Sequence, residues 1–143
     1  MAISEADLRK RWSQRQPCHG LWSLLPGAVT AEVLARTGAD YVVVDLQHGS
    51  TAEADLPGTA AAITAAGAVP LVRTRSPSFA DVGRPLDLGA RGVVVPNVRD
   101  AAHARRRSSS LGIPHPLPPS PPPGDPAGAA AGRATAPIVT PGG

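Results

Sequence analysis

Asp45 and His48 are the residues best placed to do chemistry, because they follow directly on the apolar run 41–44. A continuous apolar run bounded by turn residues is typical of a strand buried on both faces, as in a parallel sheet. Polar side chains just beyond the carboxyl end of such a strand line the ligand crevice. The pair therefore has the placement of a base and its acidic partner. A loop-capping aspartate beside a surface histidine would give the same pattern.

Arg73 ends a second apolar run, 69–73, and would reach the same edge of a parallel sheet. A guanidinium can hold a carboxylate or an oxyanion through two parallel hydrogen bonds. A base at His48, its acid partner Asp45 and a cation at Arg73 would together suit proton transfer on a small anionic substrate. Judged from the residues alone, a surface acid or salt-bridge partner explains Asp87 as well as a site role does, and core packing explains Trp22 better than a substrate contact does.

A strand followed by a helix recurs four times, with a period of roughly 22 to 28 residues. This alternation predicts an α/β fold with parallel strands. A doubly wound sheet and a (β/α)8 barrel both fit, but no Gly-rich phosphate loop follows the first strand, which favours the barrel. We expect a polar helix over 5–15, strands over 20–25, 41–45, 69–73 and 92–96, and helices over 30–37, 51–66, 78–88 and from 100 onwards.

The composition changes sharply near residue 105. Residues 1–104 contain ten basic and ten acidic side chains, so the net charge of +3 comes from the later residues and does not indicate nucleic-acid binding. Ten of the 17 prolines lie between Pro114 and Pro141. We therefore expect 1–107 to form one domain and 108–143 a disordered Pro/Gly/Ala-rich tail. The tail has the composition of a shifted reading frame of GC-rich DNA, and its PxxP spacing could also bind a partner domain.

No apolar run approaches the ~20 residues that a membrane span needs. The N-terminal segment is polar and lacks the apolar core of a signal peptide. The single cysteine, Cys18, excludes an intrachain disulfide and fits a reducing compartment. We expect a cytoplasmic protein without a membrane partner.

Several segments resemble the HpcH/HpaI aldolases, which are metal-dependent 2-oxo acid (pyruvate) aldolases on a (β/α)8 TIM barrel. The resemblance spans about residues 18–105 and rests on GLWSLL (20–25), ADYVVVDLQHG (39–49), PLVR (70–73) and RPLDLGARGVVVPNVRDAAHAR (84–105). It implies that 1–107 supplies about four of the eight β/α units. Such a truncated barrel would expose strand edges and one apolar sheet face, so we expect marginal stability or association. A complete family member would be a homo-oligomer.

The resemblance also implies roles for single residues. His48 matches the family's catalytic histidine, and Asp45 matches the acid that orients it. Arg73 matches the arginine that steadies the oxyanion and enolate of the 2-oxo acid. Asp87 matches a second acid linked to the histidine, and Trp22 matches a tryptophan beside the substrate.

Two departures from the family pattern concern the metal. Gln47 stands where the family commonly has a glutamate. The resemblance implies a divalent ion, Mg²⁺ or Mn²⁺, held by a Glu and an Asp from later strands, but Asp125 is the only carboxylate after Arg105, so we identify no metal ligand here. The only lysine, Lys10, lies in the polar N-terminal segment, which disfavours Schiff-base chemistry.

The resemblance implies a lyase that cleaves or forms a C–C bond in 4-hydroxy-2-oxo acids, yielding or using pyruvate and an aldehyde. Two alternatives stay open. One is a non-catalytic remnant or an interaction protein that binds through its Pro-rich tail. The other is a citrate-lyase-like enzyme that acts on CoA esters.

Overall fold

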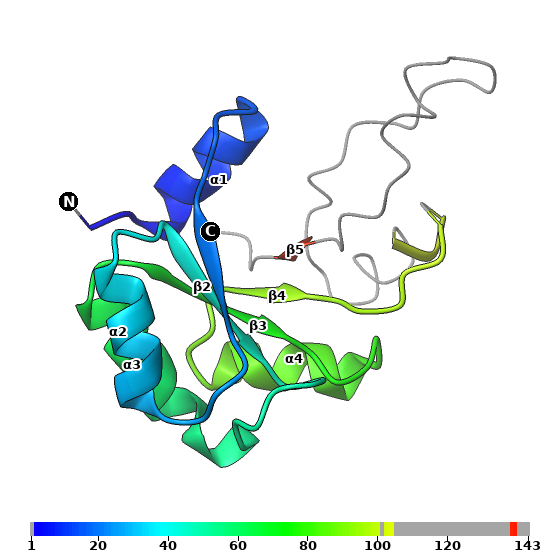
Figure 1. Ribbon diagram of the computed structural model, residues 1–143. Helices are drawn as coiled ribbons and strands as arrows, with labels where there is room; N and C mark the ends of the chain where they lie inside the picture. The colour runs from blue at the N-terminus through cyan, green and yellow to red at the C-terminus, as the bar shows by residue number, and fades with distance from the viewer. Residues whose placement is uncertain (1, 101, 105–137, 140–143) are drawn as a thin grey trace.

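A computed structural model of the chain describes residues 2–100, 102–104 and 138–139. Four parallel strands pair in the order in which they occur in the sequence (Figure 1). They are β1 (Gly20–Ser23), β2 (Tyr41–Asp45), β3 (Val69–Arg73) and β4 (Gly92–Val94). The apolar runs predicted as β2 and β3 are confirmed to the residue. β1 and β4 end two residues before the predicted ends.

Helices precede β1 and connect the strands: α1 (Glu5–Ser13), α2 (Ala28–Arg36), α3 (Leu56–Ala65) and α4 (Phe79–Asp87). α1 begins where Ser4 and Asp7 form a reciprocal capping box. α3 begins later than predicted, because a 3-10 turn, η1 (Glu53–Asp55), comes first and Pro57 occupies the first turn, where proline fits a helix. None of the helices in the described ranges is long and apolar enough to cross a bilayer.

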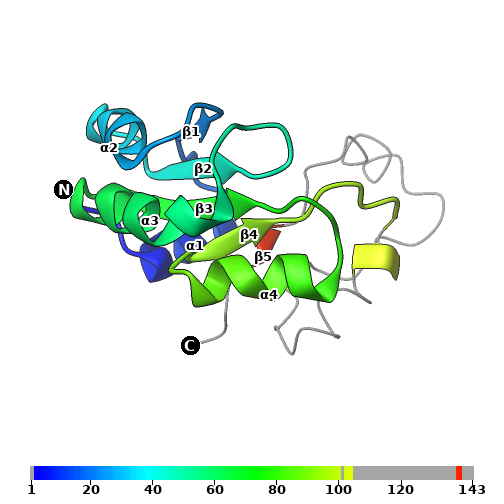
Figure 2. The same cartoon turned by 90° about the horizontal axis from the view of Figure 1, so that it is seen from below.

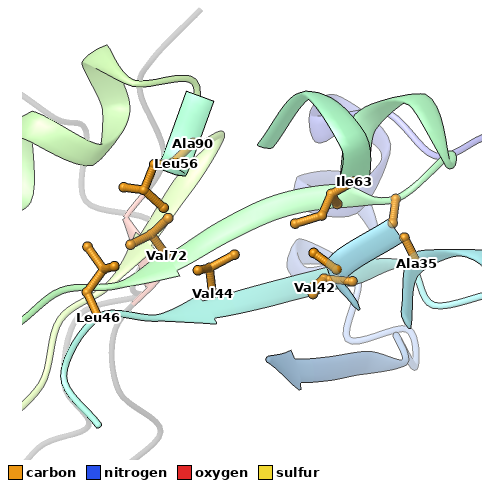
Figure 3. Packing of buried hydrophobic residues seen from close by; sticks show 10 residues of the cluster. Ala35, Val42, Val44, Leu46, Leu56, Ile63, Val72 and Ala90 are labelled. Atoms are coloured by element: carbon orange, nitrogen blue, oxygen red, sulfur yellow. The ribbon is translucent and has the colours of Figure 1, made fainter. Parts of the chain in front are cut away.

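The three connecting helices pack on one face of the sheet, on the near side in Figure 2. Side chains at alternate strand positions, Val42, Val44 and Val72, point to this face (Figure 3). They share a cluster with Leu56 and Ile63 of α3, with Val42 lying beside Ile63 and Val72 beside Leu56. Val93 of β4 meets α4 on the same side. A doubly wound sheet would carry its crossover helices on both faces. Sequential strand order with helices on one face is the arrangement of a β/α barrel.

The opposite face of the sheet is covered by α1, which lies on the far side in Figure 2. Leu8 of α1 is buried against Val43 and Leu71, which point to this side. Trp12 of α1 packs edge-to-face on Tyr41 at 5.7 Å between ring centroids. The prediction of an exposed apolar sheet face is therefore wrong for these residues, because the N-terminal helix folds back over them.

A short strand, β5 (Ile138–Val139), pairs antiparallel with β4. The prediction that the tail forms no strand is wrong at these two residues. The rest of the tail and most of the helix predicted from residue 100 lie outside the described residues.

Replacing Ile63 by alanine should destabilise the fold by about 2 to 5 kcal/mol, because Ile63 is fully buried between α3 and the sheet. Thr64→Ala, at the exposed neighbouring position, is the matched control and should change stability by less than about 0.5 kcal/mol. Urea unfolding followed by far-UV circular dichroism measures both. Equal stability of the Ile63 variant and the parent would contradict the packing described.

Candidate active site

The parallel register of the sheet brings Asp45 and Arg73 together. They are paired positions at the carboxyl ends of β2 and β3. Trp22 of β1 pairs with Val43, two residues before Asp45, and so points to the same face. Three polar groups predicted from separate segments thus meet at one corner of the sheet. This is the edge at which parallel α/β sheets bind their ligands.

The buried carboxylate of Asp45 accepts hydrogen bonds from five N–H groups. Its Oδ1 accepts from Arg73 Nε at 2.9 Å and from the backbone N–H groups of Gln47 and His48 at 2.8 and 3.1 Å. Its Oδ2 accepts from Trp22 Nε1 at 3.0 Å and from Arg73 Nη2. Asp45 has no exposed surface, so these donors replace its hydration shell.

The ionised form of Asp45 is strongly favoured. Burial acts to raise the pKa of Asp45, but the hydrogen bond from Arg73, helped by those from His48, Trp22 and Gln47, outweighs it and lowers the pKa to about 2. The carboxylate therefore stays charged near neutral pH. It acts as a fixed anchor for the arginine rather than as a proton donor or acceptor.

Arg73 lies between Asp45 and the ring of Trp22. Its Cζ is 5.2 Å from the centroid of the indole ring, within the range of a cation–π contact. Nε and Nη2 bond to Asp45, which leaves Nη1 without an acceptor among the described residues. The side chain is 22% exposed, so a ligand can reach it. An oriented guanidinium with a spare N–H edge suits a small carboxylate or oxyanion.

His48 lies three residues beyond β2 and is exposed, on the same edge as Arg73. Asp45 binds the backbone N–H of His48 in a tight Asx-type turn. The predicted contact between Asp45 and the imidazole is not formed among the described residues, because the turn and Arg73 occupy the carboxylate. A Cβ on Gly49 would lie 2.2 Å from the carbonyl oxygen of Asp45, so this turn requires glycine.

Asp87 is not brought to this edge. It is the last residue of α4 and is exposed, and α4 leads to the start of β4 at Gly92. Arg73 pairs with the far end of β4, at Val94. Asp87 and Arg73 thus lie at opposite ends of the sheet. The predicted helix 78–88 and strand 92–96 already imply this position, because a helix that leads into a parallel strand ends at the amino edge of the sheet.

Glu53 is a neighbour of the site that the sequence did not single out. Its carboxylate pairs with Arg75 at 3.5 Å and with Arg84 at 3.3 Å. These pairs join η1, which follows the His48 turn, to the segment that follows Arg73. They are largely exposed and contribute little to stability. The sequence carries no signal for them, because the partners are 22 and 31 residues apart.

The described residues do not form a metal site. No group of three or more His, Cys, Asp or Glu side chains in this part of the chain could hold an ion. The donor chemistry also does not fit, since both oxygens of Asp45 are already saturated by N–H groups. We therefore assign no metal ligand and derive no step through a metal.

The buried acid–arginine pair lies at the carboxyl edge of a parallel sheet, where α/β folds place their ligand sites. Residues 19–114 match the HpcH/HpaI aldolase/citrate lyase family, and the chain belongs to this family. A hydroxypyruvate/pyruvate aldolase from Rhizorhabdus wittichii is 36% identical over 104 residues, which cover 73% of this chain and 41% of the relative. The chain thus spans about two fifths of that relative.

Solved structures agree with this assignment. An HpcH/HpaI aldolase/citrate lyase family protein from Burkholderia cenocepacia superposes with a TM-score of 0.64 at 33% identity, over 73% of this chain and 43% of that one. A citrate synthase superposes with a TM-score of 0.62 at 31% identity, over 73% of this chain and 41% of that one. The α/β frame with its parallel sheet is therefore shared with enzymes that carry these names.

Asp45→Asn should make stability less dependent on pH. The ordinary pKa of the carboxyl is 3.8, and its pKa in the folded chain is about 2. The ionised carboxylate therefore adds to the free energy of unfolding above about pH 4, and this contribution is lost as the pH falls through 2. We expect the parent's advantage in free energy of unfolding to shrink by about 2 kcal/mol between about pH 5 and pH 2. Urea unfolding across this range measures it.

Asp55→Asn is the matched control, because Asp55 is exposed and caps α3 without a side-chain hydrogen bond. The difference in free energy of unfolding between the parent and Asp55→Asn should stay the same between about pH 5 and pH 2. A constant difference between the parent and Asp45→Asn at all pH values would contradict the described environment of Asp45.

Proposed function

We propose that this chain provides the 2-oxo acid site of an aldolase-type lyase, which cleaves or forms a C–C bond in 4-hydroxy-2-oxo acids with pyruvate and an aldehyde as the partners. The observation that carries the proposal is the Asp45–Arg73 pair at the carboxyl edge of the sheet, with Trp22 against the guanidinium. The relatives named as pyruvate aldolases support the substrate class.

Arg73 binds and orients the 2-oxo acid in this proposal. The bonds to Asp45 fix the plane of the guanidinium, so little side-chain freedom is lost when a ligand binds. The free N–H edge then receives the carboxylate or the oxygen that becomes the enolate. Trp22, which is 46% exposed, forms one wall of the site and limits the access of water to the guanidinium.

His48 accepts the proton of the substrate's 4-hydroxyl group, directly or through one water molecule. An imidazole is the side chain that most often carries out such a proton transfer. The backbone of His48 is held by Asp45, which fixes the base relative to Arg73. HpcH/HpaI aldolases generally depend on a divalent metal, such as Mg²⁺ or Mn²⁺, and such an ion would stabilise the enolate charge.

A second reaction class is favoured by one observation, the likeness to a citrate synthase. The same guanidinium would then hold a carboxylate of a larger acid, in a citrate-lyase-like reaction on CoA esters. CoA-dependent turnover separates this class from the aldolase. A chain that binds the 2-oxo acid without turning it over would be a non-catalytic member of the family.

His48→Ala should abolish the release of pyruvate from 4-hydroxy-2-oxo acids, because the base is lost. The assay couples pyruvate to lactate dehydrogenase in the presence of added Mg²⁺ or Mn²⁺, and we expect at least a hundredfold drop in kcat. His19→Ala, at another exposed histidine located before β1, should leave the rate unchanged. No metal-stimulated release by the parent chain would contradict catalysis by this chain.

Arg73→Lys should weaken pyruvate binding about tenfold or more, because lysine cannot reproduce the two-pronged contact with Asp45. Quenching of Trp22 fluorescence in a Trp12→Phe background reports binding without requiring turnover. Arg75→Lys, two residues along the chain and paired with Glu53, is the matched control and should bind as the parent does. Equal affinity of the Arg73 and Arg75 variants for pyruvate would contradict the proposal that Arg73 binds the anion.

A further inference from the structure

Two arginines share one glutamate beside the proposed site. The carboxylate of Glu53 pairs with both Arg75 and Arg84, and we call these three residues the Glu53 cluster. Two positive charges and one negative charge leave the cluster with a formal charge of +1. Its side chains are between 32% and 58% exposed. Because exposed pairs contribute little to stability, the fold alone does not account for two arginines on one acid.

The cluster joins the loops that follow β2 and β3, which carry the proposed base and the proposed anion-binding arginine. Glu53 lies in η1, after β2, and Arg75 lies two residues after Arg73. Thr74, between the two arginines, continues the strand pairing, because its N–H donates to the carbonyl oxygen of Val94 at 3.1 Å. Two residues of extended chain span at most about 7 Å. A small elongated acid can therefore extend from Arg73 to the cluster.

Both arginines of the cluster keep unused N–H groups. Arg84 donates to Glu53 through Nε, and Arg75 approaches Glu53 through Nη1. Among the described residues, Nη2 of each arginine has no acceptor. Side chains of a helix lean toward its N-terminus, and α4 begins at the carboxyl edge of the sheet, so Arg84 reaches back to this edge. Guanidinium groups with free N–H groups bind carboxylates.

Two other carboxylates on these loops have different neighbours. Asp81, in the first turn of α4, accepts a hydrogen bond from the hydroxyl of Ser76. Asp55, the residue before α3, lines an open cavity together with the N-terminus of α2. Neither pairs with the two arginines, so Glu53 is the carboxylate with which a bound anion would compete.

We propose that the Glu53 cluster binds an anionic group at the far end of the substrate, a carboxylate on the aldehyde half of the 4-hydroxy-2-oxo acid. The inference rests on the proposed function, in which Arg73 binds the 2-oxo acid end. Arg75 and Arg84 then determine specificity, because they favour acids that are negatively charged at both ends. Glu53 holds the two guanidinium groups side by side and competes with the ligand for them. Pyruvate has no second anionic group and does not use this contact.

Two acids of equal length test the proposal without requiring turnover. 2-Oxoadipate has a carboxylate at each end, whereas 2-oxohexanoate has a neutral end, and neither carries the 4-hydroxyl group that cleavage needs. Both dissociation constants can be measured through Trp22 fluorescence in the Trp12→Phe background. We expect the parent to bind 2-oxoadipate about fivefold more tightly than 2-oxohexanoate. Arg84→Gln should lower this ratio by about twofold or more, through weaker binding of 2-oxoadipate.

Glu53→Gln separates a ligand-binding role of the cluster from a structural one. Removing the competing negative charge should tighten the binding of 2-oxoadipate by about twofold, whereas the loss of a structural support would weaken it. Arg91→Gln is the matched control, because it removes one positive charge at an exposed position directly before β4, at the other end of the sheet. The ratio of the two dissociation constants in Arg91→Gln should equal that of the parent.

Equal binding of the two acids by the parent would overturn the proposal and leave the 2-oxo acid site intact. An unchanged ratio in Arg84→Gln, or the same loss in Arg84→Gln and Arg91→Gln, would also overturn it. Weaker binding of 2-oxoadipate by Glu53→Gln would assign the cluster a structural role instead. A parent that binds neither acid would overturn the proposed function together with this inference.

Discussion

The saturated carboxylate of Asp45 is the interaction on which the rest of this corner of the structure depends. Five N–H groups from three strands or their loops converge on one buried group. Burying an ion is costly unless its hydrogen bonds are replaced, and here the replacement also sets the geometry. The same two oxygens position the guanidinium of Arg73, the indole of Trp22 and the backbone of His48. One residue thus both satisfies a structural requirement of the sheet and orients the side chains of the proposed anion site.

The sequence predicted those parts of the fold that depend on local pattern. The apolar runs 41–45 and 69–73 gave strands with correct ends, and Gly38 and Gly67 end helices with φ near +93° and +94°, as a left-handed residue after a helix should. The helix predicted over 51–66 begins only at Leu56, because the 3-10 turn η1 occupies residues 53–55 and Pro57 fits the first turn of a helix. β5 was missed because two residues among prolines have no recognisable period.

The shared edge of Asp45 and Arg73 was predictable from the sequence, but the contacts made there were not. Strand-end positions correctly indicated that Asp45, His48 and Arg73 share an edge. The spacing of Asp45 and His48 suggested an acid–imidazole pair, yet the carboxylate serves the turn and the guanidinium instead. Such competition is decided by register and burial, which a single sequence does not contain. Asp87 lies at the other end of the sheet because it ends the helix that leads into β4, which the predicted elements already imply. The Glu53 ion pairs, by contrast, had no signal in the sequence.

The protonated nitrogens around Asp45 can be observed directly by nuclear magnetic resonance. The account predicts that the indole N–H of Trp22 and the Nε–H of Arg73 exchange slowly with water in the parent chain, and that both exchange fast in Asp45→Asn while the amides of α3 keep their protection. It also predicts that pyruvate shifts both signals in the parent. Fast exchange of the two signals in the parent, at the rates seen in the variant, would contradict the claim that one carboxylate organises this edge.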